Sequence, residues 1–155
     1  MQNKHLVLRS ADPLDMAGGE IDTSFPLIKD GSTLKMIIRN PEKVKSKEGT
    51  SEMIVCKLET TEELKATNDQ TIHPGHKVIS RTTITPSEKR EVQAIAKDLA
   101  TIIQAAEGKG AKTTPRQVID NPSILDGKVV FVKIGIQKEK DGFPASNTAR
   151  FVPAE

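Results

Sequence analysis

The chain has 155 residues, which is the length of one ordinary domain and enough to bury a hydrophobic core. Charged residues make up 28% of it, but the formal net charge is only +2, so any basic binding surface must be local. The single cysteine excludes an intramolecular disulfide framework, and no apolar run approaches the roughly 20 residues that span a bilayer.

These properties predict a cytoplasmic protein, in the host cytoplasm if the gene is viral. A lone cysteine is typical of a reducing compartment, and the first residues lack the apolar segment of a signal peptide. Aromatic residues are scarce, with no Trp, no Tyr and four Phe. That scarcity counts against a mechanism that depends heavily on base stacking.

Residues 1–24 are predicted to form an arm outside the main core, ahead of a domain formed by residues 25–155. The run from Leu6 to Leu8 is long enough for one short strand at most, and the turn-forming pairs Asp12-Pro13 and Gly18-Gly19 follow it. An ordered arm of this kind docks on its own domain or on a neighbouring subunit. A homo-oligomer held together by the arm is therefore an open alternative.

The first predicted strand covers Thr33 to Arg39, after a turn at Asp30-Gly31. Apolar residues alternate along it, as expected for one buried face: Leu34, Met36 and Ile38. Asn40-Pro41 is predicted to end this strand. Residues 43–49 are then expected to form a basic connector to the next strand.

The second predicted strand covers Glu52 to Glu59, with Met53 and Val55 inside and with Cys56 and Leu58 as further core candidates. Cys56 has no suitable base beside it in the sequence. We therefore interpret it as a packed strand residue rather than a nucleophile.

Residues 60–70 are polar and rich in turn formers, which predicts a loop, and the third strand is expected from Lys77 to Ile84. His73 and His76 precede that strand with a spacing that could suggest a metal site. However, the intervening Pro74-Gly75 predicts a turn, and no cysteine or aspartate cluster completes a ligand set. We expect no metal and no cofactor.

A long helix is predicted from Pro86 to Glu107. Thr85 can cap it, Pro86 suits the first helical position, and Glu88 completes a capping box. Apolar residues at three- and four-residue steps form a stripe that is expected to pack on the sheet: Val92, Ile95, Ala96, Leu99, Ile103 and Ala106. The stripe as a partner-binding face is the alternative. The same capping pattern at Thr114-Pro115 predicts one short helical turn through Ile119.

The chain ends in a predicted β-hairpin. A run of β-branched residues from Val129 to Ile136 forms its first strand, and Thr148 to Val152 forms the return strand. The charged tip between them contains Asp141-Gly142, a pair that supplies the positive φ of a tight turn. Phe131, in the middle of a strand, is expected in the core, whereas Phe143 in the tip is expected to be exposed.

The order strand, strand, strand, helix, strand, strand is that of an oligonucleotide/oligosaccharide-binding (OB) fold, with its helix between the third and fourth strands. The fold class expected is therefore mainly β with one long α-helix, arranged as a five-stranded OB-like barrel. A generic α+β domain would give the same order of elements, so this alternative stays open.

Several short sequence phrases, spread over most of residues 25–153, carry a resemblance to a known family. They are Pro26 to Ile38, Lys45-Ser46-Lys47-Glu48-Gly49, Gly127-Lys128-Val129-Val130, Lys140-Asp141-Gly142-Phe143, and Asn147. In these phrases the chain resembles small phage-encoded single-stranded DNA-binding proteins. The resemblance implies an OB fold and sequence-tolerant binding of single-stranded DNA in DNA replication or recombination, with RNA as an open alternative partner.

Proteins that bind single strands run the backbone along a basic groove and stack bases on aromatic side chains. The candidate cations come from the predicted strands and hairpin tips: Lys35, Arg39, Lys43, Lys45, Lys47, Lys57, Lys77, Arg81, Lys133, Lys138, Lys140 and Arg150. Phe143 is the best stacking candidate, and the 43–47 connector and the 138–143 tip are expected to flank one groove. The alternative is that alternating charges such as those of residues 138–141 only keep the surface hydrated.

A second interpretation is a non-enzymatic virion structural or assembly protein whose arm ties it to its neighbours. The near-neutral charge and the few aromatic residues fit that role. An enzyme is not expected, because the sequence presents no nucleophile–base pairing, phosphate-binding glycine loop or metal-ligand cluster.

Overall fold

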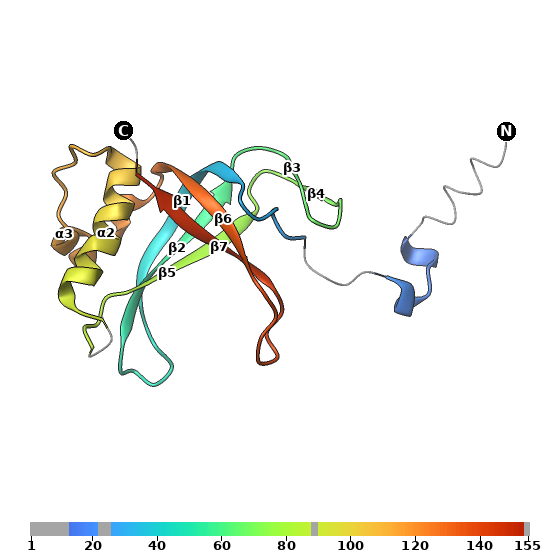
Figure 1. Cartoon of the computed structure of the whole chain (residues 1–155), viewed down its shortest axis with the longest axis horizontal. Coiled ribbons are helices and arrows are strands. Elements are labelled where there is room, and N and C mark those ends of the chain that lie inside the picture. The colour runs from blue at the N-terminus through green and yellow to red at the C-terminus, as the bar shows by residue number, and fades with distance from the viewer. Residues whose placement is uncertain (1–12, 22–25, 88–89, 154–155) are drawn as a thin grey trace.

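A computed structural model describes residues 13–21, 26–87 and 90–153 of the chain. Within these residues an antiparallel five-stranded sheet is accompanied by the long helix α2 (Figure 1). The strands of the sheet are β1 (Thr33–Lys45), β2 (Glu52–Thr60), β5 (Lys77–Thr83), β6 (Val129–Gln137) and β7 (Ser146–Val152). The described part is thus mainly β with one long helix, as the sequence predicts.

The strands follow the order β5-β2-β1-β6-β7 across the sheet, and each neighbouring pair is antiparallel. β1 is the central strand: its first residues pair with β6, and the rest of it pairs with β2. The two edge strands, β5 and β7, also contact each other, although no ladder of hydrogen bonds joins them within the described residues. The sheet is therefore curled so that its edges meet.

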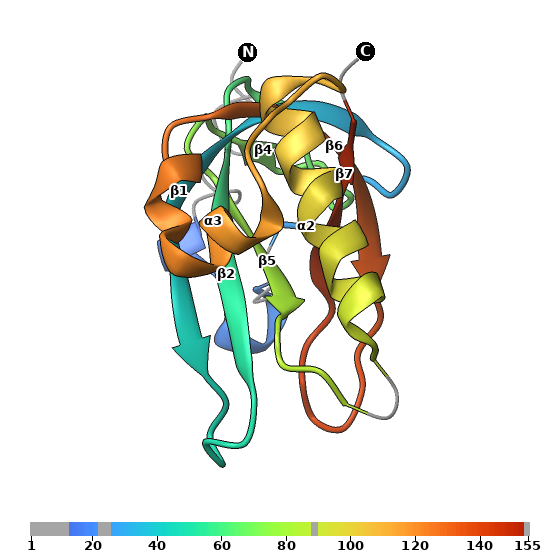
Figure 2. The same cartoon turned by 90° about the vertical axis from the view of Figure 1, so that its left-hand side faces the viewer.

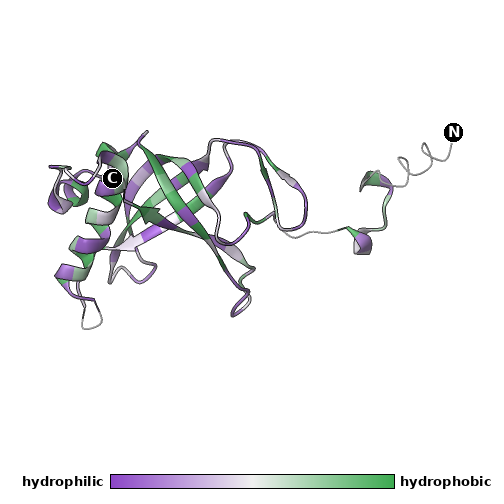
Figure 3. Ribbon diagram, turned by 45° about the horizontal axis from the view of Figure 1, so that its top comes forward, coloured by the Kyte–Doolittle hydropathy of each residue, from purple (hydrophilic) through white to green (hydrophobic). Residues whose placement is uncertain are grey.

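The core lies inside this curl because apolar and polar residues alternate along the strands, as the alternating colours in Figure 3 show. The buried strand residues include the following apolar side chains of the five-stranded sheet: Met36, Ile38, Ile54, Cys56, Leu58, Val78, Val130, Val132, Ile134 and Phe151. Among the residues that the structure describes, no helix is long and apolar enough to cross a membrane.

Helix α2 (Val92–Glu107) lies across one end of the sheet beside α3 (Pro115–Asp120) (Figure 2). It buries Ile95, Leu99, Ile102, Ile103 and Ala105, which confirms the packing stripe in part. The prediction is wrong for Val92, which is 65% exposed because it is the first residue of the helix and projects beyond the core.

The start of α2 also differs from the prediction, because the helix begins at Val92 rather than Pro86. The Thr85 hydroxyl does not cap it but accepts a 2.7 Å hydrogen bond from the backbone N–H of Glu52, which continues the pairing of β2 with the β5 side. Glu88 lies outside the described residues. The capping box at Thr114 is confirmed: its hydroxyl accepts from the Gln117 N–H at 3.2 Å, and the Gln117 side chain accepts from the Thr114 N–H at 2.8 Å.

β1 does not end at Asn40-Pro41, so that prediction is wrong. The strand passes through these residues in a β-bulge, where the register with β2 shifts between Arg39 and Glu42. Asn40 adopts a φ of 47°, and its N–H donates to a side-chain oxygen of Asp126 at 3.0 Å. A bulge tolerates proline because the inserted residues need no ladder hydrogen bond.

The bulge carries β1 on to Lys45, so only residues 46–51 form the loop between β1 and β2. The burial of β2 also differs from the prediction. Ile54, Cys56 and Leu58 are buried, whereas Met53 and Val55, which were expected inside, are half-buried on the outer face. A strand has a period of two, so Cys56 and Leu58 cannot share a face with Met53 and Val55.

Residues 61–76 contain a short hairpin, β3 (Leu64–Lys65) and β4 (Thr71–Ile72), and its first strand lies within the loop predicted at residues 60–70. Two 3-10 turns, Pro13–Asp15 and Gly18–Glu20, stand apart from the sheet (Figure 1). The strand predicted at Leu6 to Leu8 lies outside the described residues.

Candidate nucleic-acid interface

A groove lies between strand β5 and the loop that joins β6 to β7. It consists of two adjoining hollows with volumes of about 450 Å³ and about 420 Å³. Both hollows are lined by Arg81, Phe143, Pro144 and Ser146. A side chain at this junction can therefore contact a molecule bound in either hollow.

The β6–β7 loop holds Phe143 by a tight turn. The backbone groups of Lys140 and Phe143 form two reciprocal hydrogen bonds of 2.9 Å and 3.1 Å. Asp141 and Gly142 between them have φ values of 52° and 83°, as a two-residue turn of this kind requires. The predicted hairpin turn is confirmed, and it leaves the Phe143 side chain 73% exposed.

Asn147 fixes the base of this loop against the opposite wall of the groove. Its side-chain oxygen accepts a hydrogen bond from the Ile28 N–H at 2.8 Å. Its amide nitrogen donates to the carbonyls of Ile28 at 2.9 Å and of Gly135 at 3.1 Å. The neighbouring Pro26 and Leu27, which line the groove, are thereby held in register with the loop.

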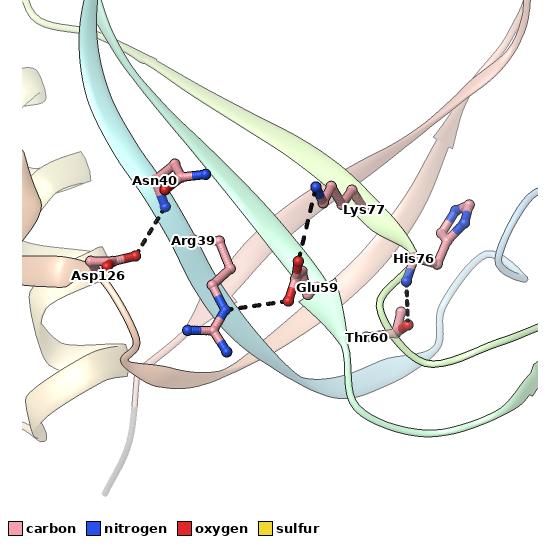
Figure 4. A network of polar contacts seen from close by, with 7 residues as sticks. All are labelled: Arg39, Asn40, Glu59, Thr60, His76, Lys77 and Asp126. Carbon is pink, nitrogen blue, oxygen red and sulfur yellow. Dashed lines mark hydrogen bonds and ion pairs between the residues drawn. The ribbon is translucent and has the colours of Figure 1, made fainter.

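The groove contains four of the predicted cations. Lys77 and Arg81 come from β5, and Lys138 and Lys140 come from the loop. Glu59 lies 4.0 Å from the Lys77 ammonium and also pairs with Arg39 at 3.3 Å (Figure 4). Among the described residues, no ion pair joins a carboxylate to Arg81, Lys138 or Lys140. In the part of the chain that the structure describes, Asp141 is the one carboxylate that lines the two hollows, so positive charge remains in excess around Phe143.

His76 lines the same groove at the start of β5. Its backbone N–H donates to the Thr60 hydroxyl at 3.1 Å, while the ring is directed away from Thr60 (Figure 4). Partial burial lowers the pKa of the imidazole below its ordinary value of 6.5. The lowered pKa favours the neutral ring at pH 7, so His76 adds little charge to the groove.

The other predicted cations lie outside this groove. Cross-strand pairing places Arg39 opposite Lys57, and Lys133 opposite Arg150. Lys35, Lys43, Lys45 and Lys47 also lie outside the two hollows. The β1–β2 loop nevertheless projects to the same side of the molecule as the β6–β7 loop, with the end of β5 between them (Figures 1 and 2).

The prediction that Phe131 belongs to the core is wrong. Its neighbours Val130 and Val132 are buried, so the alternation of β6 turns Phe131 outward, where it is 50% exposed. Every residue from Val129 to Ile134 except Lys133 is apolar, and such a run does not show from the sequence which face is buried.

Sequence reasoning assigned no role in a groove to His76 or Asn147. His76 could have been found from its position directly before a predicted strand. Asn147 gave no local signal, because its partner Ile28 is 119 residues away. A hydrogen bond between residues so far apart in the sequence cannot be recognised from the residues next to Asn147.

Cys56 is buried, and burial raises the pKa of its thiol from 9.0 to about 11. A thiol in that environment is a packing group and not a nucleophile. Within the described residues, no group of three or more His, Cys, Asp or Glu side chains is arranged to hold a metal ion.

Comparison with known proteins does not assign the chain to a family. No protein-family model and no curated protein matches the chain.

Proposed function

We propose that the sheet is an OB-like barrel that binds single-stranded DNA, without dependence on base sequence, in the groove between β5 and the β6–β7 loop. The strand order and the position of α2 between β5 and β6 support the barrel, because OB folds have this connectivity. OB barrels are partly open, so edge strands that meet without a ladder are compatible with one.

The observation that carries the proposal is the exposed ring of Phe143 beside unpaired cations. A two-residue turn holds the ring outside the core, and Arg81, Lys138 and Lys140 line the same hollow. An aromatic face stacks on any base, and cations contact the phosphates of any sequence. The combination therefore favours a flexible single strand, whose bases are free to stack, over a duplex.

The binding contribution expected from this groove is modest. Each stacked base is worth about 1–3 kcal/mol, and the groove presents one exposed ring. Most of the remaining affinity would come from the release of counterions. The resemblance to phage-encoded single-stranded DNA-binding proteins supports a role in DNA replication or recombination.

The test is fluorescence anisotropy with a labelled oligothymidine of about 16 nucleotides, within the site size of one OB fold. Titrations at about 50 mM and about 200 mM salt give the slope of log affinity against log salt. Contacts from Arg81, Lys138 and Lys140 alone predict a slope of about −2, at about −0.7 per contact, and each further cation that contacts the strand makes the slope steeper. Oligouridine and a duplex of equal length serve as the comparison ligands.

We expect binding at low salt that weakens as salt is raised and that exceeds binding to the duplex. No binding at low salt, or binding that is independent of salt, would exclude the nucleic-acid function. Either result would favour the non-enzymatic structural role instead.

A further inference from the structure

The outer face of β6 carries exposed residues from one end to the other. Val129, Phe131, Lys133 and Gln137 are exposed on this face, and the half-buried Gly135 lies among them. Gln137 lines the hollow that contains Phe143, so the face runs from the groove past Phe131. Six residue steps of about 3.4 Å separate Phe131 from Gln137, which is roughly 20 Å.

The surroundings of Phe131 resemble those of Phe143. Lys35 of β1 lies directly opposite Phe131 on one side, and Val152 of β7 lies opposite on the other. The next outward pair along the same strands is Lys133 with Arg150. A second exposed ring is thus flanked by three cations, on a part of the sheet outside the groove.

Two further hollows lie along this face between the two rings. Lys133, Gly135, Thr148 and Arg150 line one of about 390 Å³, and Lys35 and Phe131 line another of about 300 Å³. Gly135 has no side chain to project from this face. A Cβ at this position would lie only 2.7 Å from the Thr148 hydroxyl oxygen, so a larger residue would clash there. One carboxylate borders each hollow. In the first, Asp30 faces two cations, whereas in the second Glu62 balances Lys35.

We propose that Phe131 is a second base-stacking contact, and that a long single strand leaves the groove and continues along the outer face of β6 and β7 to reach it. This inference rests on the proposed function. The spacing of exposed aromatic rings with cations between them matches the alternation of bases and phosphates in a single strand. A two-fold interface with a second copy would instead place this face against itself, so that Lys35, Lys133 and Arg150 of one copy approach the same group of cations on the other.

The experiment uses the absence of Trp and Tyr from the chain. Phe131→Trp and Phe143→Trp each create a single fluorophore, whose emission is quenched when a base stacks on it. Each variant is titrated with oligothymidines of about 4 and about 16 nucleotides, the two ends of the range for one OB fold. Val129→Trp, on the same outward face of β6 and 43% exposed in the parent, is the matched control.

We expect the short oligothymidine to quench the fluorophore at position 143 alone, and the long one to quench those at positions 131 and 143. We also expect Phe131→Ala to weaken binding of the long oligothymidine by about 5- to 150-fold and to leave binding of the short one unchanged. Val129→Ala should leave both affinities unchanged. Thermal unfolding of each alanine variant confirms that it is folded.

The outcomes separate the two proposals. If the parent binds neither oligothymidine, the proposed function fails. If the parent binds and position 143 is quenched, but position 131 is quenched no more than position 129, only the second contact is excluded. The emission at position 131 is also measured against protein concentration in the absence of DNA. A change would show that two copies contact each other at this face, and it would exclude Phe131 as the second stacking contact.

Discussion

The side-chain amide of Asn147 pairs with both backbone polar groups of Ile28, 119 residues earlier in the chain. Ile28 is buried, so its N–H and carbonyl have no ready access to water. The same amide also donates to the carbonyl of Gly135 in β6. One side chain therefore holds together the segment before β1, the β6–β7 hairpin and one wall of the groove.

Replacing this amide should destabilise the fold. Asn147→Ala leaves the backbone groups of Ile28 without partners, and a buried unsatisfied polar group costs about 1–3 kcal/mol. Urea unfolding measures the loss. Thr148→Ala, at the adjacent exposed position on the opposite face of β7, should change stability by less than about 0.5 kcal/mol. Equal stability of both variants would mean that water replaces the Asn147 hydrogen bonds.

Phe143→Ala should weaken binding of oligothymidine by about 1–3 kcal/mol, because one stacked base is lost. The salt slope should stay nearly unchanged, since a stacking contact releases no counterions. The side chain is 73% exposed, so the melting temperature should also stay nearly unchanged. Anisotropy titrations at several salt concentrations measure both quantities. An unchanged affinity would show that the tip is an ordinary solvated turn.

Removing lysines from the hairpin loops should change the salt slope and not the fold. Lys138→Ala with Lys140→Ala removes two groove contacts and should flatten the slope by about 1.4. Lys45→Ala with Lys47→Ala tests the β1–β2 loop as the second side of the interface and should also flatten the slope. Exposed lysines contribute little to folding, so thermal stability should remain that of the parent. A parental slope in both double variants would contradict the assignment of these loops.

Leu99→Ala should reduce the free energy of unfolding by about 2–5 kcal/mol, because Leu99 is fully buried in α2 and its truncation leaves a cavity. Val92→Ala, at the exposed start of the same helix, is the control and should cost less than about 0.5 kcal/mol. Chemical denaturation monitored by circular dichroism measures both. Similar losses for the two variants would contradict the packing of α2 on the sheet.

Cys56 should make stability fall at alkaline pH. Burial raises the pKa of its thiol from 9.0 to about 11, so the folded chain keeps a proton that the unfolded chain has lost. The effect is absent below about pH 9 and grows as the pH rises to 11, where it reaches about 2–3 kcal/mol. Lysines titrate in the same range, so the comparison is with Cys56→Ala. The parent should lose more stability than that variant between these pH values, and parallel curves would contradict the burial of the thiol.

Much of the local structure could be predicted from the sequence, because it depends on interactions between near neighbours. The Thr114 capping box is formed by residues three positions apart, and the Asp141-Gly142 turn needs only two residues that adopt positive φ. The order of the main strands and of the long helix also follows from periodicity over short windows. Phe143 was correctly expected to be exposed for the same reason, since it adjoins that turn.

Tertiary structure decided what depends on distant partners. The Thr85 hydroxyl could cap a helix, but it accepts a hydrogen bond from the backbone N–H of Glu52 instead. Helix α2 therefore begins only at Val92. Pro41 could end a strand, but the bulge beside Asp126 accommodates it. The outward position of Phe131 depends on which face of the sheet lies inside the curl, and the groove depends on β5 and the β6–β7 loop meeting across more than 50 residues. A residue's own neighbours cannot specify these choices, because the competing hydrogen-bond partners and packing surfaces exist only once the chain has folded.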